Sequence, residues 1–115
     1  MNIVEDEIIL ESIVKRIVKS IHTEKIILFG SRSKGNYDKE SDFDICVIKE
    51  SVEHRRKCAQ HIYKLLYGVG ASIDIIVETT ERFDEFKNNP FMVYQEIAEH
   101  GKVIYEKNSP LSTNG

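Results

Sequence analysis

Three aspartates stand inside otherwise apolar stretches of this sequence, at a spacing that suits metal chemistry. Asp42 and Asp44 are two positions apart, so in a strand both side chains project from one face, about 7 Å apart. Asp74 lies between Ile73 and Ile75, where a lone buried carboxylate would be costly to ionise. If the two strands are neighbours, the three carboxylates converge, and their repulsion favours a bound divalent cation. Mg²⁺ fits best, because it combines a few carboxylate ligands with water and substrate phosphates.

Each of these aspartates also has a plain structural interpretation. An aspartate at the start of a strand is commonly a turn residue, and the Asp-x-Asp pattern at residues 42–44 is weak evidence by itself. Asp74 alone would suit a hydrogen-bonded or solvent-facing position in a strand. The combination favours a metal site, because three independent coincidences would otherwise be required.

A turn rich in small residues follows the first apolar run. Gly30 would let the backbone approach a ligand closely, and free N–H groups at the start of a short helix would attract phosphate. The Ser31 hydroxyl adds a possible donor, and Arg32 supplies positive charge nearby. The alternative is an ordinary strand-to-helix turn. Ten residues separate Ser31 from Asp42, which allows the chain to return and bring this turn beside the carboxylates.

The composition is that of a soluble globular domain. Of the 115 residues, 41% are hydrophobic and 30% charged, which excludes collagen-like and wholly disordered chains. With 16 Lys and Arg against 19 Asp and Glu, the net charge is −3, so a protein held to nucleic acid mainly by phosphate attraction is not expected. The acidic start at residues 5–7, the absence of a membrane-length apolar run and two cysteines without metal spacing predict a soluble, cytoplasmic protein with no membrane partner.

The periodicity of the apolar residues predicts an α/β domain, with helices packed on a small mixed β-sheet in an α+β arrangement. Helices are expected over residues 10–22, over 52–67, after Thr79 or Thr80, and from the Asn89-Pro90 pair to Gly101. Strands are expected at 25–29, 41–48, 72–77 and 103–105, the last at a sheet edge. Residues 1–106 are expected to form a single domain, followed by a flexible C-terminal tail at 107–115.

Two runs make this pattern specific: Gly-Ser-Arg-Ser-Lys-Gly at residues 30–35 and Ser-Asp-Phe-Asp-Ile at 41–45. With the later strand aspartate, they resemble the signature of the polymerase β nucleotidyltransferase superfamily. The chain is most similar to the minimal nucleotidyltransferases, the antitoxin partners of HEPN-domain toxins, over about residues 25–106. One departure is Ser33, where many minimal members carry alanine, and we expect little effect from the added hydroxyl.

This resemblance implies a two-metal mechanism and a polymerase β-like nucleotidyltransferase fold. Asp42 and Asp44 would bridge two Mg²⁺ ions, and Asp74 would complete the second metal site and help remove the acceptor's proton. The nucleotide-binding residues would be Gly30, Ser31 and Arg32, with the first two on the β- and γ-phosphates. In the minimal family, the nucleotide is usually ATP and the acceptor a tyrosine hydroxyl of the partner toxin, which receives AMP.

Three other functions are compatible with the sequence. The protein could be a small-molecule nucleotidyltransferase, although 115 residues leave little room for an acceptor-binding domain. It could also be a non-catalytic module that neutralises a toxin by contact, or a nucleotide-binding subunit of a larger assembly. A polymerase acting directly on nucleic acid is not expected, because no helical accessory segment remains to grip a primer.

Overall fold

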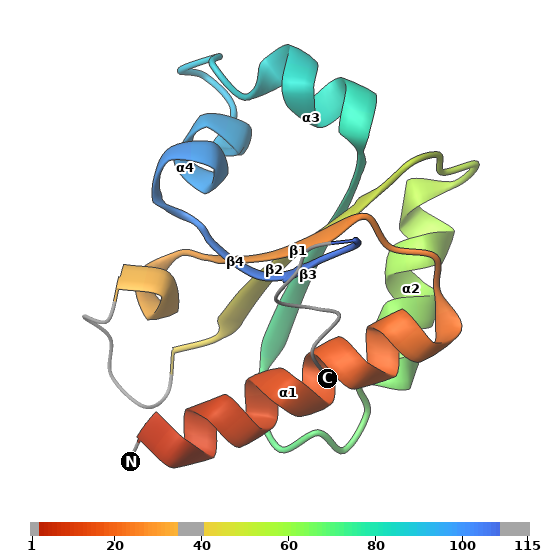
Figure 1. Cartoon of the computed structure of the whole chain (residues 1–115), viewed down its shortest axis with the longest axis vertical. Helices are drawn as coiled ribbons and strands as arrows, with labels where there is room; N and C mark the ends of the chain where they lie inside the picture. Colours follow the sequence, from red (N-terminus) through yellow and green to blue (C-terminus); the bar gives the residue numbers. More distant parts are fainter. Residues whose placement is uncertain (1–2, 35–40, 109–115) are drawn as a thin grey trace.

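The computed structural model describes residues 3–34 and 41–108 as a sheet with helices on both faces. The elements follow in the order α1 (Ile3–Ser20), β1 (Lys25–Phe29), the 3-10 helix η1 (Ser31–Lys34), β2 (Phe43–Lys49), α2 (Arg55–Leu65), β3 (Ile73–Thr79), α3 (Thr80–Phe86), α4 (Val93–His100) and β4 (Lys102–Glu106). Helices α1 and α2 cover one face, and α3 and α4 lie over the other (Figure 1). The predicted α+β architecture with a small mixed sheet is confirmed.

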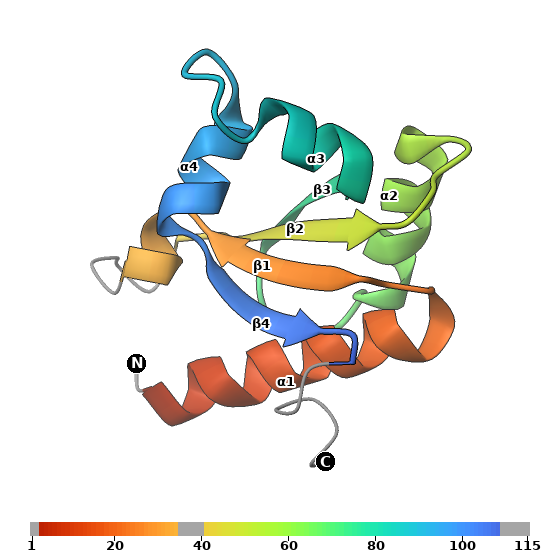
Figure 2. The same ribbon diagram turned by 45° about the horizontal axis from the view of Figure 1, so that its top comes forward.

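The sheet has the strand order β3-β2-β1-β4. Strand β1 pairs antiparallel with both β2 and β4, whereas β2 and β3 are parallel because α2 returns the chain between them. The end of β1 and the start of β2 therefore lie at the same end of the sheet, and η1 follows β1 there (Figure 2). We call this row of strand ends the sheet edge. Because β3 runs parallel to β2, its first residues belong to this edge too.

Each face of the sheet has its own hydrophobic core. The core under α1 and α2 is built around fully buried side chains: Ile13, Ile17, Ile26, Ile45, Val47 and Ile62. The core under α3 and α4 is smaller and contains Ile27, Phe29, Cys46, Ile48, Phe83, Tyr94 and Ile97. Burying an aliphatic or aromatic side chain contributes about 1.5–3 kcal/mol, so these two cores hold the sheet edge in place.

Most predicted elements are present, but the prediction that Asn89 and Pro90 start a helix is wrong. Helix α4 begins at Val93, and the side chain of Asn89 instead accepts a hydrogen bond from the backbone N–H of Phe91 (2.8 Å). This side-chain hydrogen bond offers the backbone a turn in place of a helical start. Phe91, within the range predicted to be helical, is 94% exposed.

Several boundaries also differ from those predicted. The second strand begins at Phe43 rather than at residue 41, the helix predicted from residue 52 begins at Arg55, and β3 extends two residues further, to Thr79. At the C-terminal end, Lys107 is not yet part of a free tail, because its N–H donates to the carbonyl of Glu24 (2.9 Å). Gly35 of the glycine-containing run and residues 109–115 of the expected tail lie outside the described residues.

Candidate active site

The predicted aspartates come together at the sheet edge where β1 ends and β2 and β3 begin. Asp44 of β2 is the register partner of Asp74 on β3, and on its other side it faces Phe29, the last residue of β1. Asp42 immediately precedes β2. Asp44 is half-buried in this position, whereas Asp74 is exposed at the outer strand. The fold therefore pairs Asp44 with Asp74, as the prediction requires, and leaves Asp42 one residue before the strand at the same end of the sheet.

The electrostatics of Asp44 reflect this crowding. Burial raises the pKa of its carboxyl group above the usual value of 3.8, and the negative charges of Asp74 and Asp42 raise it further. A hydrogen bond with Asp74 acts in the same direction, because two carboxylates can share a hydrogen bond only when one of them is protonated. In the absence of a cation, a proton thus relieves part of the repulsion at this edge.

Gly30 directly follows β1 and lies beside the carboxylate of Asp44. Its φ of +74° lies in the left-handed region that side chains avoid. A Cβ atom added at this position would lie 2.2 Å from Oδ2 of Asp44, far inside van der Waals contact. The backbone at Gly30 consequently passes directly beside the carboxylate, and only glycine permits this approach.

Ser31 follows as the first residue of η1 and is exposed, so its hydroxyl is accessible at the edge that carries the aspartates. The turn is stabilised by Ser33, whose hydroxyl donates a hydrogen bond to the carbonyl of Gly30 (2.8 Å). The prediction that Ser33 adds little is therefore incomplete. A hydrogen bond of this kind typically contributes about 1 kcal/mol, and alanine at this position would not make it.

Arg32 does not share the orientation expected from the sequence. Its side chain is only 6% exposed, and its guanidinium group lies 3.0 Å from the carboxylate of Asp6, in the first turn of α1. It also donates to the carbonyl of Ser41 (2.8 Å) and lies over the ring of Phe43, 4.1 Å from its centroid. The group is thus held between α1 and the start of β2, and nucleotide binding by Arg32 stays a prediction.

The donor set at the edge fits Mg²⁺, which prefers carboxylate oxygens. The unrelieved repulsion that raises the pKa of Asp44 is the kind that a bound cation would remove. Within residues 3–34 and 41–108, however, no three His, Cys, Asp or Glu side chains are already grouped closely enough to hold a metal ion. The carboxylates would have to turn toward a shared ion, with the hydrogen bond between Asp44 and Asp74 given up.

Comparison with known proteins decides the family. The sequence profile of the nucleotidyltransferase domain matches residues 9–104. The chain belongs to this family. The matched region contains the Gly30 turn and all three aspartates, and the assignment as a nucleotidyltransferase, which the motifs predicted, is confirmed.

Three individual proteins illustrate the similarity of this nucleotidyltransferase to others. The "Putative protein adenylyltransferase MJ0604" of Methanocaldococcus jannaschii is 38% identical over 81 residues, which cover 70% of this chain and 77% of that protein. A crystal structure of a "putative nucleotidyltransferase from Sulfolobus solfataricus" has a TM-score of 0.64 at 18% identity, covering 90% of this chain and 84% of the other. A crystal structure of a "toxin-antitoxin with AMP-PNP" has a TM-score of 0.61 at 23% identity, covering 86% and 74%. The two structures share the fold.

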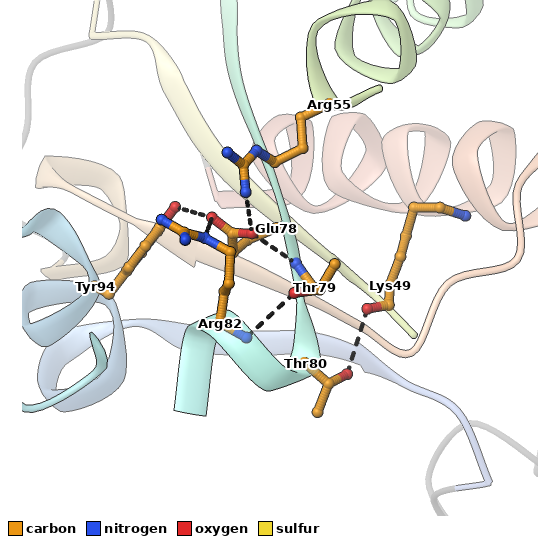
Figure 3. A network of polar contacts seen from close by, with 7 residues as sticks. All are labelled: Lys49, Arg55, Glu78, Thr79, Thr80, Arg82 and Tyr94. Atoms are coloured by element: carbon orange, nitrogen blue, oxygen red, sulfur yellow. Dashed lines mark hydrogen bonds and ion pairs between the residues drawn. The ribbon is translucent and has the colours of Figure 1, made fainter. Parts of the chain in front are cut away.

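Sequence reasoning missed a buried carboxylate at the other end of β3. Glu78 is 1% exposed and accepts hydrogen bonds from Tyr94, from Arg55 (2.9 Å) and from the backbone N–H of Thr79 (2.9 Å), with Arg82 3.5 Å away (Figure 3). These contacts join β3 to α2, α3 and α4. Glu78 lies four residues along the strand from Asp74, so it does not belong to the aspartate cluster. Successive side chains of a strand point to opposite faces, so a predicted strand that reached Thr79 would have placed Glu78 on the same face as Asp74.

We expect the Glu78→Gln substitution to lower the free energy of unfolding by about 1–3 kcal/mol at neutral pH, because the hydrogen bonds from Tyr94, Thr79 and Arg55 lose their buried, charged acceptor. Burial alone would raise the pKa of Glu78, but hydrogen bonds from Tyr94, Thr79 and Arg55 outweigh it and hold the pKa below the usual 4.5. This stabilisation is therefore present above the usual pKa and is lost as the pH falls through the folded-state value. Urea unfolding from neutral to acidic pH measures it. The exposed Glu81→Gln variant is the control, and equal stability of both variants would contradict the expectation.

Tyr63 of α2 also contacts the outer strand. Its hydroxyl accepts a hydrogen bond from the backbone N–H of Ile75 (2.9 Å), next to Asp74 on the outer strand. This contact satisfies one donor of an otherwise open strand edge and fixes the strand beside Asp74.

Among the described helices, none combines the length and apolar composition needed to cross a bilayer.

Proposed function

We propose that this nucleotidyltransferase is a Mg²⁺-dependent protein adenylyltransferase. It would transfer AMP from ATP to a tyrosine hydroxyl of a partner HEPN toxin and act as the antitoxin. The observation that carries the proposal is the position of Asp44, flanked in the sheet by Asp74 and approached by the backbone of Gly30. A triphosphate needs both features, since its charge must be neutralised while its phosphates are gripped by groups that come close.

In this proposal, each aspartate has a distinct task. Asp42 and Asp44 would hold two Mg²⁺ ions between them, and Asp74 would contribute to one of these sites. When bound, the ions would neutralise charge on the triphosphate and on the attacking oxygen. Asp74 is the exposed member of the set and would take the proton from the acceptor hydroxyl as its oxygen attacks the α-phosphorus. A phosphorus–oxygen bond to the acceptor forms, the α–β phosphoanhydride bond breaks, and pyrophosphate leaves.

The turn at Gly30 and Ser31 would position that leaving group. The absence of a side chain at Gly30 leaves its backbone accessible, and the exposed hydroxyl of Ser31 can donate to a phosphate oxygen. Holding the β- and γ-phosphates fixes the α-phosphorus in line with the acceptor, which lowers the entropic part of the barrier.

Two similarities support a protein as the acceptor. The archaeal relative at 38% identity bears the name of a protein adenylyltransferase, and a solved structure with the same fold is a toxin–antitoxin with AMP-PNP, an ATP analogue. We propose that this chain likewise uses ATP and acts on a toxin encoded beside it. A small domain of this kind would then take its acceptor hydroxyl from the partner protein.

The position of the transferred label tests the proposal. Incubated with its partner toxin and Mg²⁺, the protein is expected to transfer label from ATP labelled at the α-phosphate and none from ATP labelled at the γ-phosphate. Replacing acceptor tyrosines of the toxin by phenylalanine should abolish labelling. Transfer of the γ-label would contradict the proposal. Inhibition of the toxin by an Asp42→Asn/Asp44→Asn variant that leaves the toxin unlabelled would also contradict it.

A further inference from the structure

Arg32 is the residue whose observed position departs most from the sequence-based expectation. Its Nε donates to the carbonyl of Ser41 at 2.8 Å, and its NH1 lies 3.0 Å from Oδ2 of Asp6. Its guanidinium plane lies over Phe43, which is itself 1% exposed. One side chain of η1 therefore contacts both α1 and the start of β2.

We infer that Arg32 is a positioning residue for Asp42, acting through a bridge formed by Arg32 and Asp6. Ser41, which accepts the hydrogen bond from Arg32, directly precedes Asp42, and Phe43 directly follows it. The bridge thus holds the backbone on both sides of Asp42. It also starts within η1, directly after Gly30 and Ser31, so it fixes the distance between the turn and the carboxylate. The inference rests on the proposed function for the roles of Asp42 and the turn.

The chemistry of the guanidinium group explains why arginine is suited to this position. Its planar fork can donate to Ser41 with one nitrogen and to Asp6 with another, while its central carbon lies over the ring of Phe43. A lysine ammonium group is a point charge that cannot make all three contacts together. The pair is also well shielded, with side-chain exposures of 6% for Arg32 and 14% for Asp6, so solvent screens it little.

The chain offers a matched control on the same helix. Arg16 of α1 also donates through NH1 to backbone carbonyls, those of Leu65 (3.2 Å) at the end of α2 and of Tyr67 (2.9 Å) just beyond it. Arg16→Lys removes a comparable bridge between α1 and the rest of the fold at a place remote from Asp42. It reports the effect of weakening an anchor of α1 without disturbing the start of β2.

The test compares Arg32→Lys, Asp6→Asn and Arg16→Lys by Mn²⁺ binding, followed by electron paramagnetic resonance of the free ion, and by AMP-transfer kinetics. Partners that orient metal ligands typically change metal affinity by 10–100-fold, so we expect Arg32→Lys and Asp6→Asn each to weaken Mn²⁺ binding at least about tenfold. The kcat should fall by about tenfold or more, with the KM for ATP changed less than about threefold. Arg16→Lys should leave Mn²⁺ affinity and kcat unchanged, and Asp6→Glu, which keeps the carboxylate, should recover most of both.

A direct role in ATP binding would give the opposite split: a raised KM for ATP in Arg32→Lys, and no loss in Asp6→Asn. That result overturns the inference, as does unchanged Mn²⁺ affinity in both variants.

Amide hydrogen exchange tests the bridge between Arg32 and Asp6 even if the wild-type protein transfers no AMP. The N–H of Phe43 donates to the carbonyl of Ser72 (2.9 Å), and its exchange should accelerate about tenfold in Asp6→Asn but not in Arg16→Lys. Equal exchange in the two variants would refute the bridge itself, whatever the activity.

Discussion

Replacing Asp44 by asparagine should abolish AMP transfer while making the folded chain more stable at neutral pH. The activity loss should reach about a thousandfold or more, corresponding to roughly 4 kcal/mol of transition-state stabilisation, because Asp44 is the central carboxylate of the proposed site. The stability gain follows from the same position, since burial and the charges of Asp74 and Asp42 disfavour an ionised Asp44. Asparagine keeps the shape and removes the charge.

The pH dependence of unfolding separates this account from simple damage to the fold. Because the folded-state pKa of Asp44 is raised above 3.8, its contribution to stability is complete below that value and is lost as the pH rises through the folded-state pKa. Urea unfolding of the wild type should show this loss, and Asp44→Asn should not. Asp84→Asn, an exposed aspartate of α3, is the control for the chemical change. Retained activity in Asp44→Asn, or a stability below that of the wild type at neutral pH, would contradict the account.

The second large effect is expected from Gly30→Ala. The added Cβ would lie 2.2 Å from Oδ2 of Asp44 and would force either the turn or the carboxylate to move. We expect AMP transfer to fall by about a hundredfold or more, because a displacement of about 1 Å at a reacting centre has this effect. The steric conflict and the left-handed φ together should lower the free energy of unfolding by roughly 2–4 kcal/mol.

Gly68 provides the matched control for this substitution. It has a similar φ of +79°, but nothing lies within 4 Å of a Cβ added there. Gly68→Ala should therefore show only the backbone strain, about 1–2 kcal/mol, with unchanged transfer kinetics. Chemical denaturation and initial rates of transfer measure the two effects. Similar activity in Gly30→Ala and Gly68→Ala would mean that the contact between Gly30 and Asp44 has no role in the reaction.

The parts of the site that depend on local pattern could be predicted from the sequence. The apolar run at residues 25–29 predicted the bounds of β1, and two-residue alternation predicted Asp44 within the next strand, whereas Asp42 lies one residue before β2 begins. Convergence with Asp74 required one further assumption, that the two strands are neighbours. The crossover through α2 makes them parallel and in register, which satisfies that assumption.

The parts that depend on side-chain direction could not be predicted. A charged residue in a glycine-containing turn suggests a ligand, but the guanidinium of Arg32 is directed at Asp6, 26 positions away in the sequence. The role of Glu78 likewise depends on Tyr94 and Arg55, which come from two separate helices. At Asn89, helix-capping preference and turn formation favour the same residue type, and the turn is adopted. Long-range contacts decide the first two cases, whereas a local hydrogen bond between residues 89 and 91 decides the third.

The most direct measurement of the central claim is peptide mass spectrometry of the partner toxin, purified after co-expression with the wild-type protein or with Asp44→Asn. We expect a toxin that carries AMP on tyrosine in the first preparation and an unmodified, active toxin in the second. An unmodified toxin that is nevertheless inhibited by both proteins would contradict the account, and would assign neutralisation to contact alone.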